Sequence, residues 1–330
     1  MGALFHYAPA LSRYFRNVDR RWACPLPESV QPVGLPQRRA DLRHVRAVIW
    51  DIYGTLCGMD TGALSQSLTE PERLSKSAEA TAQEFNLEVS LQKLCPNLPP
   101  AQTLSQMYLR EIEASHARSL QQDIQYPEVV IERIWQRILA DCCRVGYEPP
   151  YAEPLLQTAC RAAYFFDCSL QRTYFYAQAA SCLARLQKAD LVQGIISNAQ
   201  FYTPWHLRRL LREATGGTME LEDIFTPSLI LFSYQLGFSK PNPAAFRLAL
   251  RHLKTLNISA DQTVYVGNDM ANDIAVAARQ GMATVFFSGD AAMARLGETD
   301  GQQRPIEPDA VVTNLAAVAD MILTEPHTGR

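Results

Sequence analysis

Four short polar clusters, far apart in the sequence, carry the side chains most able to do chemistry. They are the segment 51–56 (DIYGTL), Ser197-Asn198, the segment 239–241 (SKP) and the segment 267–273 (GNDMAND). Two neighbouring carboxylates such as Asp51 and Asp269 repel each other unless a cation lies between them, and Mg²⁺ prefers hard oxygen ligands of this kind. An aspartate beside Mg²⁺ and a lysine can attack phosphorus. The residue types therefore predict Asp51 as a nucleophile, with Lys240 offsetting negative charge.

The elements that must position these clusters are short apolar runs, which are typical of buried strands. Such runs lie at 46–50, 192–196, 229–232, 263–266, 284–287 and 310–312. Helical patterns alternate with them, near 177–186, 204–213, 243–255, 270–280 and 314–323. This alternation predicts an α/β fold with a Rossmann-like, doubly wound parallel sheet. Because ligands bind at the carboxyl ends of the strands in such sheets, we expect the four clusters to meet at one edge.

The segment 58–171 has a different pattern, with helical spacing throughout and no strand pattern. Leu104, Met107 and Tyr108 recur at helical spacing, as do the apolar residues of 130–139. Pro127 fits the first turn of this second helix. The segment is therefore expected to be all helical.

One strand precedes the helical segment and the others follow it, so the segment is predicted to be an insertion. We expect an α/β core formed by 45–57 and 172–330, with 58–171 as an inserted α-helical cap domain. Residues 1–44 hold several arginines and a proline-rich stretch. They are expected to form an N-terminal arm and linker packed on the core.

The four clusters, in this order, resemble the motifs of the haloacid dehalogenase (HAD) superfamily, and the insert resembles that family's C1-type helical cap. The resemblance implies that Asp51 is the nucleophile and a Mg²⁺ ligand, with the Tyr53 carbonyl and Asp269 as further ligands. Asn268 and Asp273 would support these ligands. The residues that would bind the transferred group are Thr55, Ser197, Asn198 and Lys240. The catalytic residues would be Asp51, Tyr53 and Lys240.

Tyr53 departs from the commonest pattern of the family's phosphatases, which place an aspartate two residues after the nucleophile as general acid and base. A phenol, with a reference pKa of about 10, is a poor base at neutral pH. The D-x-Y-G-T form of 51–55 resembles the family's 2-haloacid dehalogenases, in which an aspartate displaces halide from carbon without a metal.

The last cluster favours a different chemistry, because Asp269 and Asp273 keep a phosphatase-like spacing. Two negative charges on Asp51 and Asp269 would repel each other without a cation between them, which is energetically unfavourable. The last cluster is therefore the stronger indication, and it favours a metal-dependent phosphatase. The prediction is a Mg²⁺-dependent phosphatase of a small phosphorylated metabolite that works through an aspartyl-phosphate at Asp51. Two alternatives stay open: a metal-independent 2-haloacid dehalogenase, and a catalytically weak binding or scaffold protein with the same fold.

Composition narrows the classes of partner. The formal net charge is −3, so the chain has no overall positive charge that would attract nucleic acid. The sequence contains no run of roughly 18 apolar residues, so it predicts no membrane-spanning helix. The eight cysteines show no CxxC pair and are interpreted as small apolar residues of a reducing compartment. We therefore expect a cytoplasmic enzyme with a small-molecule substrate and no nucleic-acid or membrane partner. A homodimer is an open alternative to a monomer.

Overall fold

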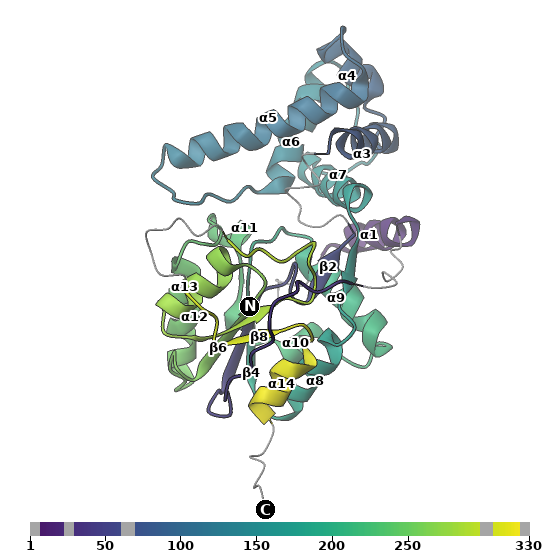
Figure 1. Ribbon diagram of the computed structural model, residues 1–330. Helices are drawn as coiled ribbons and strands as arrows, with labels where there is room; N and C mark the ends of the chain where they lie inside the picture. Colours follow the sequence, from purple (N-terminus) through teal and green to yellow (C-terminus); the bar gives the residue numbers. More distant parts are fainter. Residues whose placement is uncertain (1–6, 23–29, 61–69, 298–305, 324–330) are drawn as a thin grey trace, which may run out of the picture. The chain divides into compact units, whose positions relative to one another are not determined.

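The computed structural model describes residues 7–22, 30–60, 70–297 and 306–323 (Figure 1). The chain divides into two compact units. A helical unit comprises Met1–Pro25, Asp60–Thr173 and Gln200–Pro204, and an α/β unit comprises Leu26–Met59, Tyr174–Ala199 and Trp205–Arg330.

The α/β unit contains a six-stranded parallel sheet with the strand order β5-β4-β1-β6-β7-β8. The strands are β1 (Ala47–Trp50), β4 (Val192–Ser197), β5 (Ile230–Phe232), β6 (Thr263–Gly267), β7 (Ala283–Phe287) and β8 (Ala310–Val312). β1 lies between β4 and β6, with Trp50 opposite Ile195 on one side and Val266 on the other. The predicted parallel α/β sheet is therefore confirmed.

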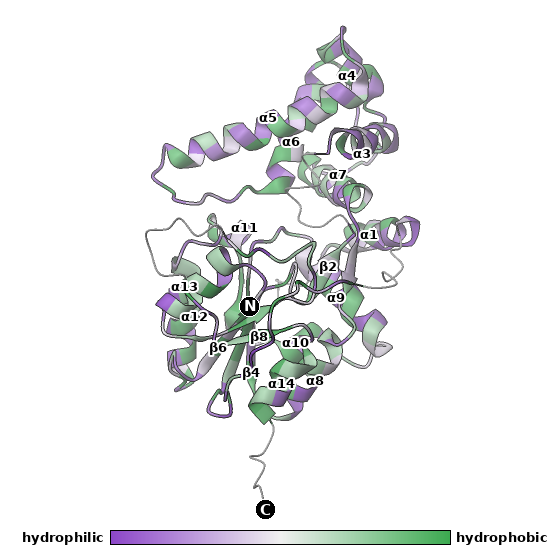
Figure 2. Cartoon of the chain, in the orientation of Figure 1, coloured by the Kyte–Doolittle hydropathy of each residue, from purple (hydrophilic) through white to green (hydrophobic). Residues whose placement is uncertain are grey.

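The helices between these strands explain why the strands are mainly apolar and buried. They are α8 (Ala179–Lys188), α9 (Thr203–Thr215), α10 (Leu221–Ile224), α11 (Ser233–Leu236), α12 (Ala244–Thr255), α13 (Ala275–Arg279) and α14 (Ala316–Leu323), with a 3-10 turn η1 (Pro227–Leu229) and a π turn η2 (Met270–Ile274). Every residue of β1 and β6 is buried, as expected when helices cover both faces of a parallel sheet. Figure 2 shows the strands as mainly hydrophobic and the helices as mixed.

The insertion between β1 and β4 is mainly helical, as predicted. Its helices are α3 (Pro71–Glu84), α4 (Glu88–Leu94), α5 (Pro100–Leu120), α6 (Ile131–Arg144) and α7 (Leu155–Leu170). The apolar stripe of α6, which includes Ile134, Trp135 and Ile138, is buried, and α6 contacts α7. The helix begins at Ile131 and not at Pro127, so the predicted start was wrong: Val130, in extended backbone geometry, precedes the first turn.

A two-stranded sheet of β2 (Cys57–Met59) and β3 (Thr173–Phe175) was not predicted from the sequence. Each strand has only three residues, which is too short for a recognisable alternation of apolar and polar positions. β2 begins directly after the segment 51–56, and the Tyr176 N–H donates to the Leu56 carbonyl at 3.1 Å. The small sheet therefore fixes the chain that follows Asp51.

The N-terminal residues contribute to both units. Helix α1 (Pro9–Arg21) buries Leu11, Tyr14, Phe15 and Val18 and contacts α7 of the helical unit, whereas the sequence suggested an arm packed on the core. An aromatic contact explains this position, since the Phe15 and Tyr164 ring centroids lie 4.0 Å apart.

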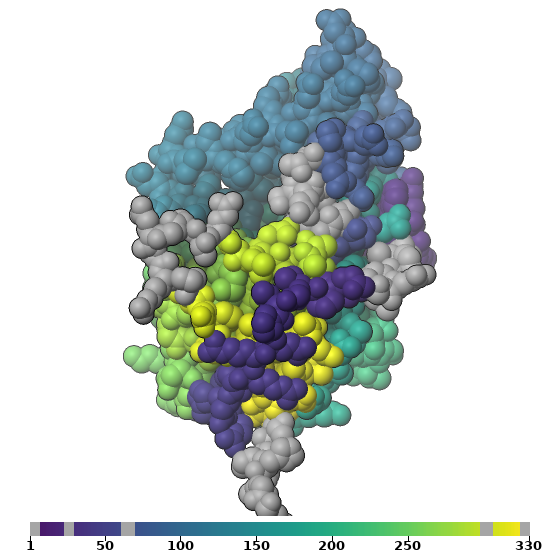
Figure 3. Space-filling model, viewed as in Figure 1, coloured from purple at the N-terminus to yellow at the C-terminus, as the bar shows by residue number. Residues whose placement is uncertain are grey.

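Residues 30–44 run across the α/β unit, where they lie over the C-terminal residues drawn in yellow in Figure 3. Arg38 pairs in antiparallel fashion with Val311 of β8, the last strand of the sheet. This pairing covers a strand edge that would otherwise expose unpaired backbone groups. No helix in the described part of the chain is long and apolar enough to span a membrane.

Candidate active site

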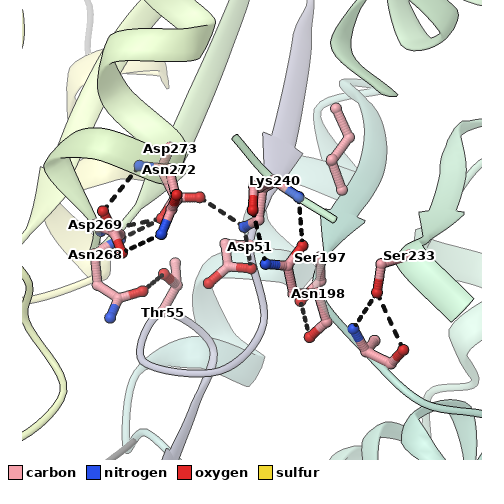
Figure 4. A network of polar contacts seen from close by, with 12 residues as sticks. Asp51, Thr55, Ser197, Asn198, Ser233, Lys240, Asn268, Asp269, Asn272 and Asp273 are labelled. Carbon is pink, nitrogen blue, oxygen red and sulfur yellow. Dashed lines mark hydrogen bonds and ion pairs between the residues drawn. The ribbon is translucent and has the colours of Figure 1, made fainter. Parts of the chain in front are cut away.

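The predicted site residues lie at the carboxyl ends of the central strands. Asp51 follows β1, Ser197 ends β4, and Asn268 and Asp269 follow β6. Lys240 comes from the loop before α12. Figure 4 shows Lys240 close to Asp51 and Asp273, with Asn198 beside it.

A buried ion-pair network links three of these residues. The Lys240 Nζ donates to Asp51 Oδ1 at 2.6 Å and to Asp273 Oδ1 at 2.6 Å. The exposed fractions of Asp51, Lys240 and Asp273 are 5%, 8% and 1%. Charge-assisted hydrogen bonds in such a dry environment are short and strong. The fold therefore brings together three residues that are separated by up to 222 positions in the sequence, as Asp51 and Asp273 are.

The protonation of the network follows from its geometry. Burial disfavours the Lys240 ammonium, but Asp273 and Asp51 outweigh this effect and raise the pKa of Lys240 above its ordinary value. Burial raises the pKa of Asp273, and the Lys240 charge opposes that rise. Asp273 Oδ2 also accepts the backbone N–H groups of Asn268 and Asp269, at 3.1 and 3.0 Å. Lys240 is therefore a fixed positive charge beside Asp51.

Asn198 holds the main chain of Lys240. Its Oδ1 accepts the Lys240 N–H at 2.7 Å, and its Nδ2 donates to the Lys240 carbonyl at 3.3 Å. The side chain that the sequence assigned to the transferred group is thus used to orient the lysine. The Ser197 hydroxyl makes only a long contact, at 3.5 Å, with the Asn198 carbonyl. Ser233, which the sequence analysis missed, fixes the chain after Asn198 by bonding to the Ala199 N–H at 2.8 Å.

Asp269 caps the short π turn that follows β6. Its Oδ1 accepts the backbone N–H groups of Ala271 and Asn272, and its Oδ2 accepts the Asn272 side chain at 2.8 Å. Donors of this kind fix the direction of a carboxylate. Asp269 is close enough to Asp273 to raise the pKa of Asp273.

Comparisons with known proteins agree with these features. The sequence model of the HAD-hydrolase-like family matches residues 237–318, which contain Lys240, Asp269 and Asp273. The chain is 29% identical over 147 residues to the glyceraldehyde 3-phosphate phosphatase of Pyrococcus furiosus and 31% identical over 109 residues to that of Pyrococcus abyssi. Residues 237–318 therefore match the HAD-hydrolase-like family. The matched regions are 44% and 33% of this chain, and they span 54% and 40% of the two relatives.

A solved structure shows the same fold. The 2-haloacid dehalogenase of Pseudomonas syringae pv. Tomato DC3000 matches with a TM-score of 0.50 and 22% identity, over 84% of this chain and 97% of that one. The likeness covers both the sheet and the inserted helices.

The turn at 51–56 is shaped by close contact with Asn268. Gly54 has a φ of +92°, and a Cβ at this position would lie 2.1 Å from Asn268 Nδ2, so only glycine fits. The fully buried Thr55 hydroxyl donates to Asn268 Oδ1 at 3.2 Å, and Asn268 Nδ2 donates to the Met293 carbonyl at 2.7 Å. Thr55 and Asn268 thus hold the turn in place, whereas the sequence placed Thr55 on the transferred group.

The donor set of this site fits a magnesium ion in its chemistry, because carboxylate oxygens are the ligands that Mg²⁺ prefers. The Lys240 ammonium pairs with Asp51 and Asp273, and the carboxylate of Asp269 is close enough to Asp273 to raise its pKa. Asp51 Oδ2 accepts no hydrogen bond from the described residues. The three carboxylates do not all lie within 4.8 Å of one another in the described part of the chain. Both oxygens of Asp273 are engaged, Oδ1 by Lys240 and Oδ2 by two backbone N–H groups, so the ligands would be Asp51, Asp269 and the Tyr53 carbonyl.

Proposed function

We propose that this HAD protein is a Mg²⁺-dependent phosphatase of a small phosphorylated metabolite. The observation that carries the proposal is the buried ammonium of Lys240, 2.6 Å from Asp51, with Asp269 oriented nearby by three N–H donors. This arrangement neutralises only part of the local negative charge. A phosphoryl group brings further negative charge, and a divalent cation is the natural compensation.

In the proposed reaction, the Asp51 carboxylate attacks the phosphorus atom. The new Asp51–phosphorus bond forms as the bond to the leaving oxygen breaks, which gives an aspartyl-phosphate. Lys240 offsets the charge on both the carboxylate and the transferring oxygens, and Asn198 keeps Lys240 in place through its main chain. The Ser197 hydroxyl would supply a further donor, whereas the N–H groups of Gly54 and Thr55 already donate to the carbonyls of Cys57 and Ile52.

Water then attacks the phosphorus atom and breaks the bond to Asp51, which releases phosphate and restores the carboxylate. A magnesium ion held by Asp51, Asp269 and the Tyr53 carbonyl would supply charge neutralisation to the phosphoryl oxygens. Tyr53 stands where a carboxylic general acid would protonate the leaving oxygen. Because a phenol has a reference pKa of about 10, the proposed enzyme favours substrates with good leaving groups.

The two relatives suggest which substrate to test first. Both are glyceraldehyde 3-phosphate phosphatases, and their matched regions cover about half or less of their length. We therefore propose glyceraldehyde 3-phosphate and other small sugar phosphates as a first panel, beside a generic aryl phosphate such as p-nitrophenyl phosphate.

Phosphate release with and without the metal tests the proposal. The full chain is expected to release phosphate from the aryl phosphate in Mg²⁺, to stop in excess chelator and to recover when Mg²⁺ is restored. Trapping a phosphorylated protein that is labile to hydroxylamine would support the aspartyl-phosphate. Full activity in chelator would contradict the metal requirement, and no phosphate release from any substrate of the panel would contradict the phosphatase.

Tyr53 favours a second candidate, metal-independent hydrolysis of a 2-haloacid. In this reaction Asp51 would displace halide from carbon to form an ester, which water would then cleave. Halide is a weak base and leaves without a proton, so no general acid is needed at position 53. Halide release from 2-chloropropionate in chelator would support this candidate. If neither phosphate nor halide is released, the remaining candidate is a binding or scaffold protein with the HAD fold.

A further inference from the structure

Tyr265 places a hydroxyl group next to Lys240 of the candidate site, while its ring lies in the apolar core. It belongs to β6, its exposed fraction is 0%, and its ring packs 5.0 Å from that of Phe246. Its hydroxyl oxygen lies 3.1 Å from Lys240 Nζ and 2.9 Å from the Ile196 carbonyl. A phenylalanine would fill nearly the same space, so the hydroxyl is the feature that requires an explanation.

The hydrogen bonds of the Lys240 ammonium account for this hydroxyl. A lysine ammonium has three N–H donors and no acceptor, and a buried donor without a partner is costly. Lys240 Nζ has three acceptors, which are Asp51 Oδ1, Asp273 Oδ1 and Tyr265 Oη. All three N–H donors of the ammonium therefore have an acceptor, and this position satisfies the hydrogen bonding of Lys240 completely.

The proton of the Tyr265 hydroxyl is also used. The Ile196 carbonyl, at 2.9 Å, is nearer than Asp273 Oδ1, at 3.1 Å, and it accepts this proton when Lys240 donates to the hydroxyl oxygen. Burial, with Asp273 and Asp51, raises the pKa of Tyr265 well above its ordinary value, so the group stays a neutral hydroxyl. Ile196 immediately precedes Ser197 in β4. The hydroxyl thus joins the end of β4 to the lysine.

We propose that Tyr265 is a positioning residue that holds the Lys240 ammonium against the nucleophile Asp51. This inference rests on the proposed function of Asp51 and Lys240. A neutral acceptor suits this role, since it completes the hydrogen bonds of the ammonium without adding a negative charge that would compete with Asp51. Asn198 fixes the main chain of Lys240, and Tyr265 fixes its charged end.

The kinetic test compares Tyr265→Phe with a matched control, Tyr147→Phe. The Tyr147 hydroxyl is also buried and donates to a main-chain carbonyl, that of Phe85, at 2.9 Å, but it belongs to the helical unit and has no bond to Lys240. With the aryl phosphate in Mg²⁺, we expect Tyr265→Phe to lower kcat roughly tenfold, less than the loss of an oxyanion donor itself, with KM unchanged within about twofold. Tyr147→Phe should keep the wild-type kcat even if its thermal stability falls.

A structural measurement decides the inference independently of turnover. Crystal structures of the wild type and of Tyr265→Phe would give the distance between Lys240 Nζ and Asp51 Oδ1, which we expect to lengthen beyond hydrogen-bond range in the variant. If Lys240 stays on Asp51 and kcat is unchanged, the inference is wrong.

The two measurements separate this inference from the proposed function. A wild-type protein that releases no phosphate would overturn the proposed function, and the lysine displacement alone would then decide the role of Tyr265. Equal losses of kcat in Tyr265→Phe and Tyr147→Phe, with Lys240 in place, would indicate a purely structural hydroxyl and would also overturn the inference.

Discussion

At the scale of single residues, the site is governed by one ammonium group among three carboxylates. Lys240 bonds to Asp51 and Asp273 at the same distance, 2.6 Å, although only Asp51 is a proposed nucleophile. The two carboxylates differ in their other hydrogen-bond partners. Asp273 Oδ2 accepts two backbone N–H groups, whereas Asp51 Oδ2 accepts no hydrogen bond from the described residues. Both oxygens of Asp273 are therefore engaged in hydrogen bonds, and Asp51 keeps an oxygen available for bond formation.

Asp51→Asn is expected to abolish turnover while the fold persists. An amide is a far weaker nucleophile than a carboxylate, so kcat should fall by more than roughly a thousandfold. Phosphate release measures the loss, and far-UV circular dichroism with thermal unfolding measures the fold. Asp41→Asn is a suitable control, because Asp41 is exposed and pairs only with the exposed Arg43. Wild-type activity in Asp51→Asn would remove Asp51 as the nucleophile.

Tyr53→Asp is expected to place a general acid within the turn that follows Asp51. General acid–base catalysis is worth roughly 10²–10⁴-fold, so phosphate release from alkyl phosphates should rise by at least about tenfold. Aryl phosphates with good leaving groups should gain little. The measurement is the dependence of kcat/KM on the leaving-group pKa, which should become flatter in the variant. A uniform loss over all substrates would show that the tyrosine has a role of its own.

Much of the site could be predicted from the sequence, because its residues follow strands whose carboxyl ends must meet. Asp51, Lys240 and Asp273 were expected to lie together, and they do. The direction of a side chain depends on partners that the sequence does not show. The amide of Asn198 bonds to Lys240, and Asp269 caps its own turn. A tyrosine inside an otherwise apolar strand was the available signal for Tyr265.

At the scale of elements, the strands of the main sheet were predictable because each is a short apolar run buried on both faces. The β2–β3 pair was not, since its stability comes from contacts distant in sequence. The carboxylate of the buried Asp290, after β7, accepts the hydroxyls of Tyr176 at 2.6 Å and Tyr174 at 3.3 Å. This cluster anchors the end of β3 and, through it, the strand that follows the nucleophile turn.

Asp290→Ala is expected to destabilise the α/β unit. The substitution leaves two buried hydroxyls without their acceptor and removes the bond to the Ala292 N–H, which together should cost about 2–4 kcal/mol. The measurement is the free energy of unfolding from urea denaturation. Asp41→Ala, at an exposed aspartate, should change this free energy by less than about 0.5 kcal/mol. A similarly small effect of Asp290→Ala would show that the cluster does not anchor β3.

At the scale of the whole molecule, the sequence predicted the insertion of a helical segment. It did not predict which other residues belong to each of the two units. The sequence assigned 200–204 to the core because they follow β4, yet they cluster with the helical unit. Within that unit, the Gln200 side chain accepts the Ile131 N–H at 3.2 Å and donates to the Val129 carbonyl at 3.1 Å. Such pairings join residues about seventy positions apart, and no periodicity in the sequence indicates them.

The helical unit also contains a buried acid that should make stability depend on pH. Asp167 in α7 is 6% exposed, and burial raises its pKa to about 7, although hydrogen bonds from Tyr202 and Gln171 oppose the rise. The unfolded chain would release this proton near a pKa of about 4. Between these values the folded state binds the proton more tightly. The stabilisation is therefore complete below about pH 4 and is lost as the pH rises through about 7.

Asp167→Asn removes this titration and should flatten the pH dependence. From pH 5 to pH 8, the wild type should lose about 2–3 kcal/mol of unfolding free energy relative to the variant, because about two pKa units lie between pH 5 and the pKa of Asp167. Urea denaturation of both proteins at the two pH values measures the difference, and the comparison cancels every other group that titrates in both. Because an asparagine can still accept from Tyr202, the variant should be the more stable protein at pH 8. Parallel pH profiles for the two proteins would show that Asp167 is ionised in the folded state across this range.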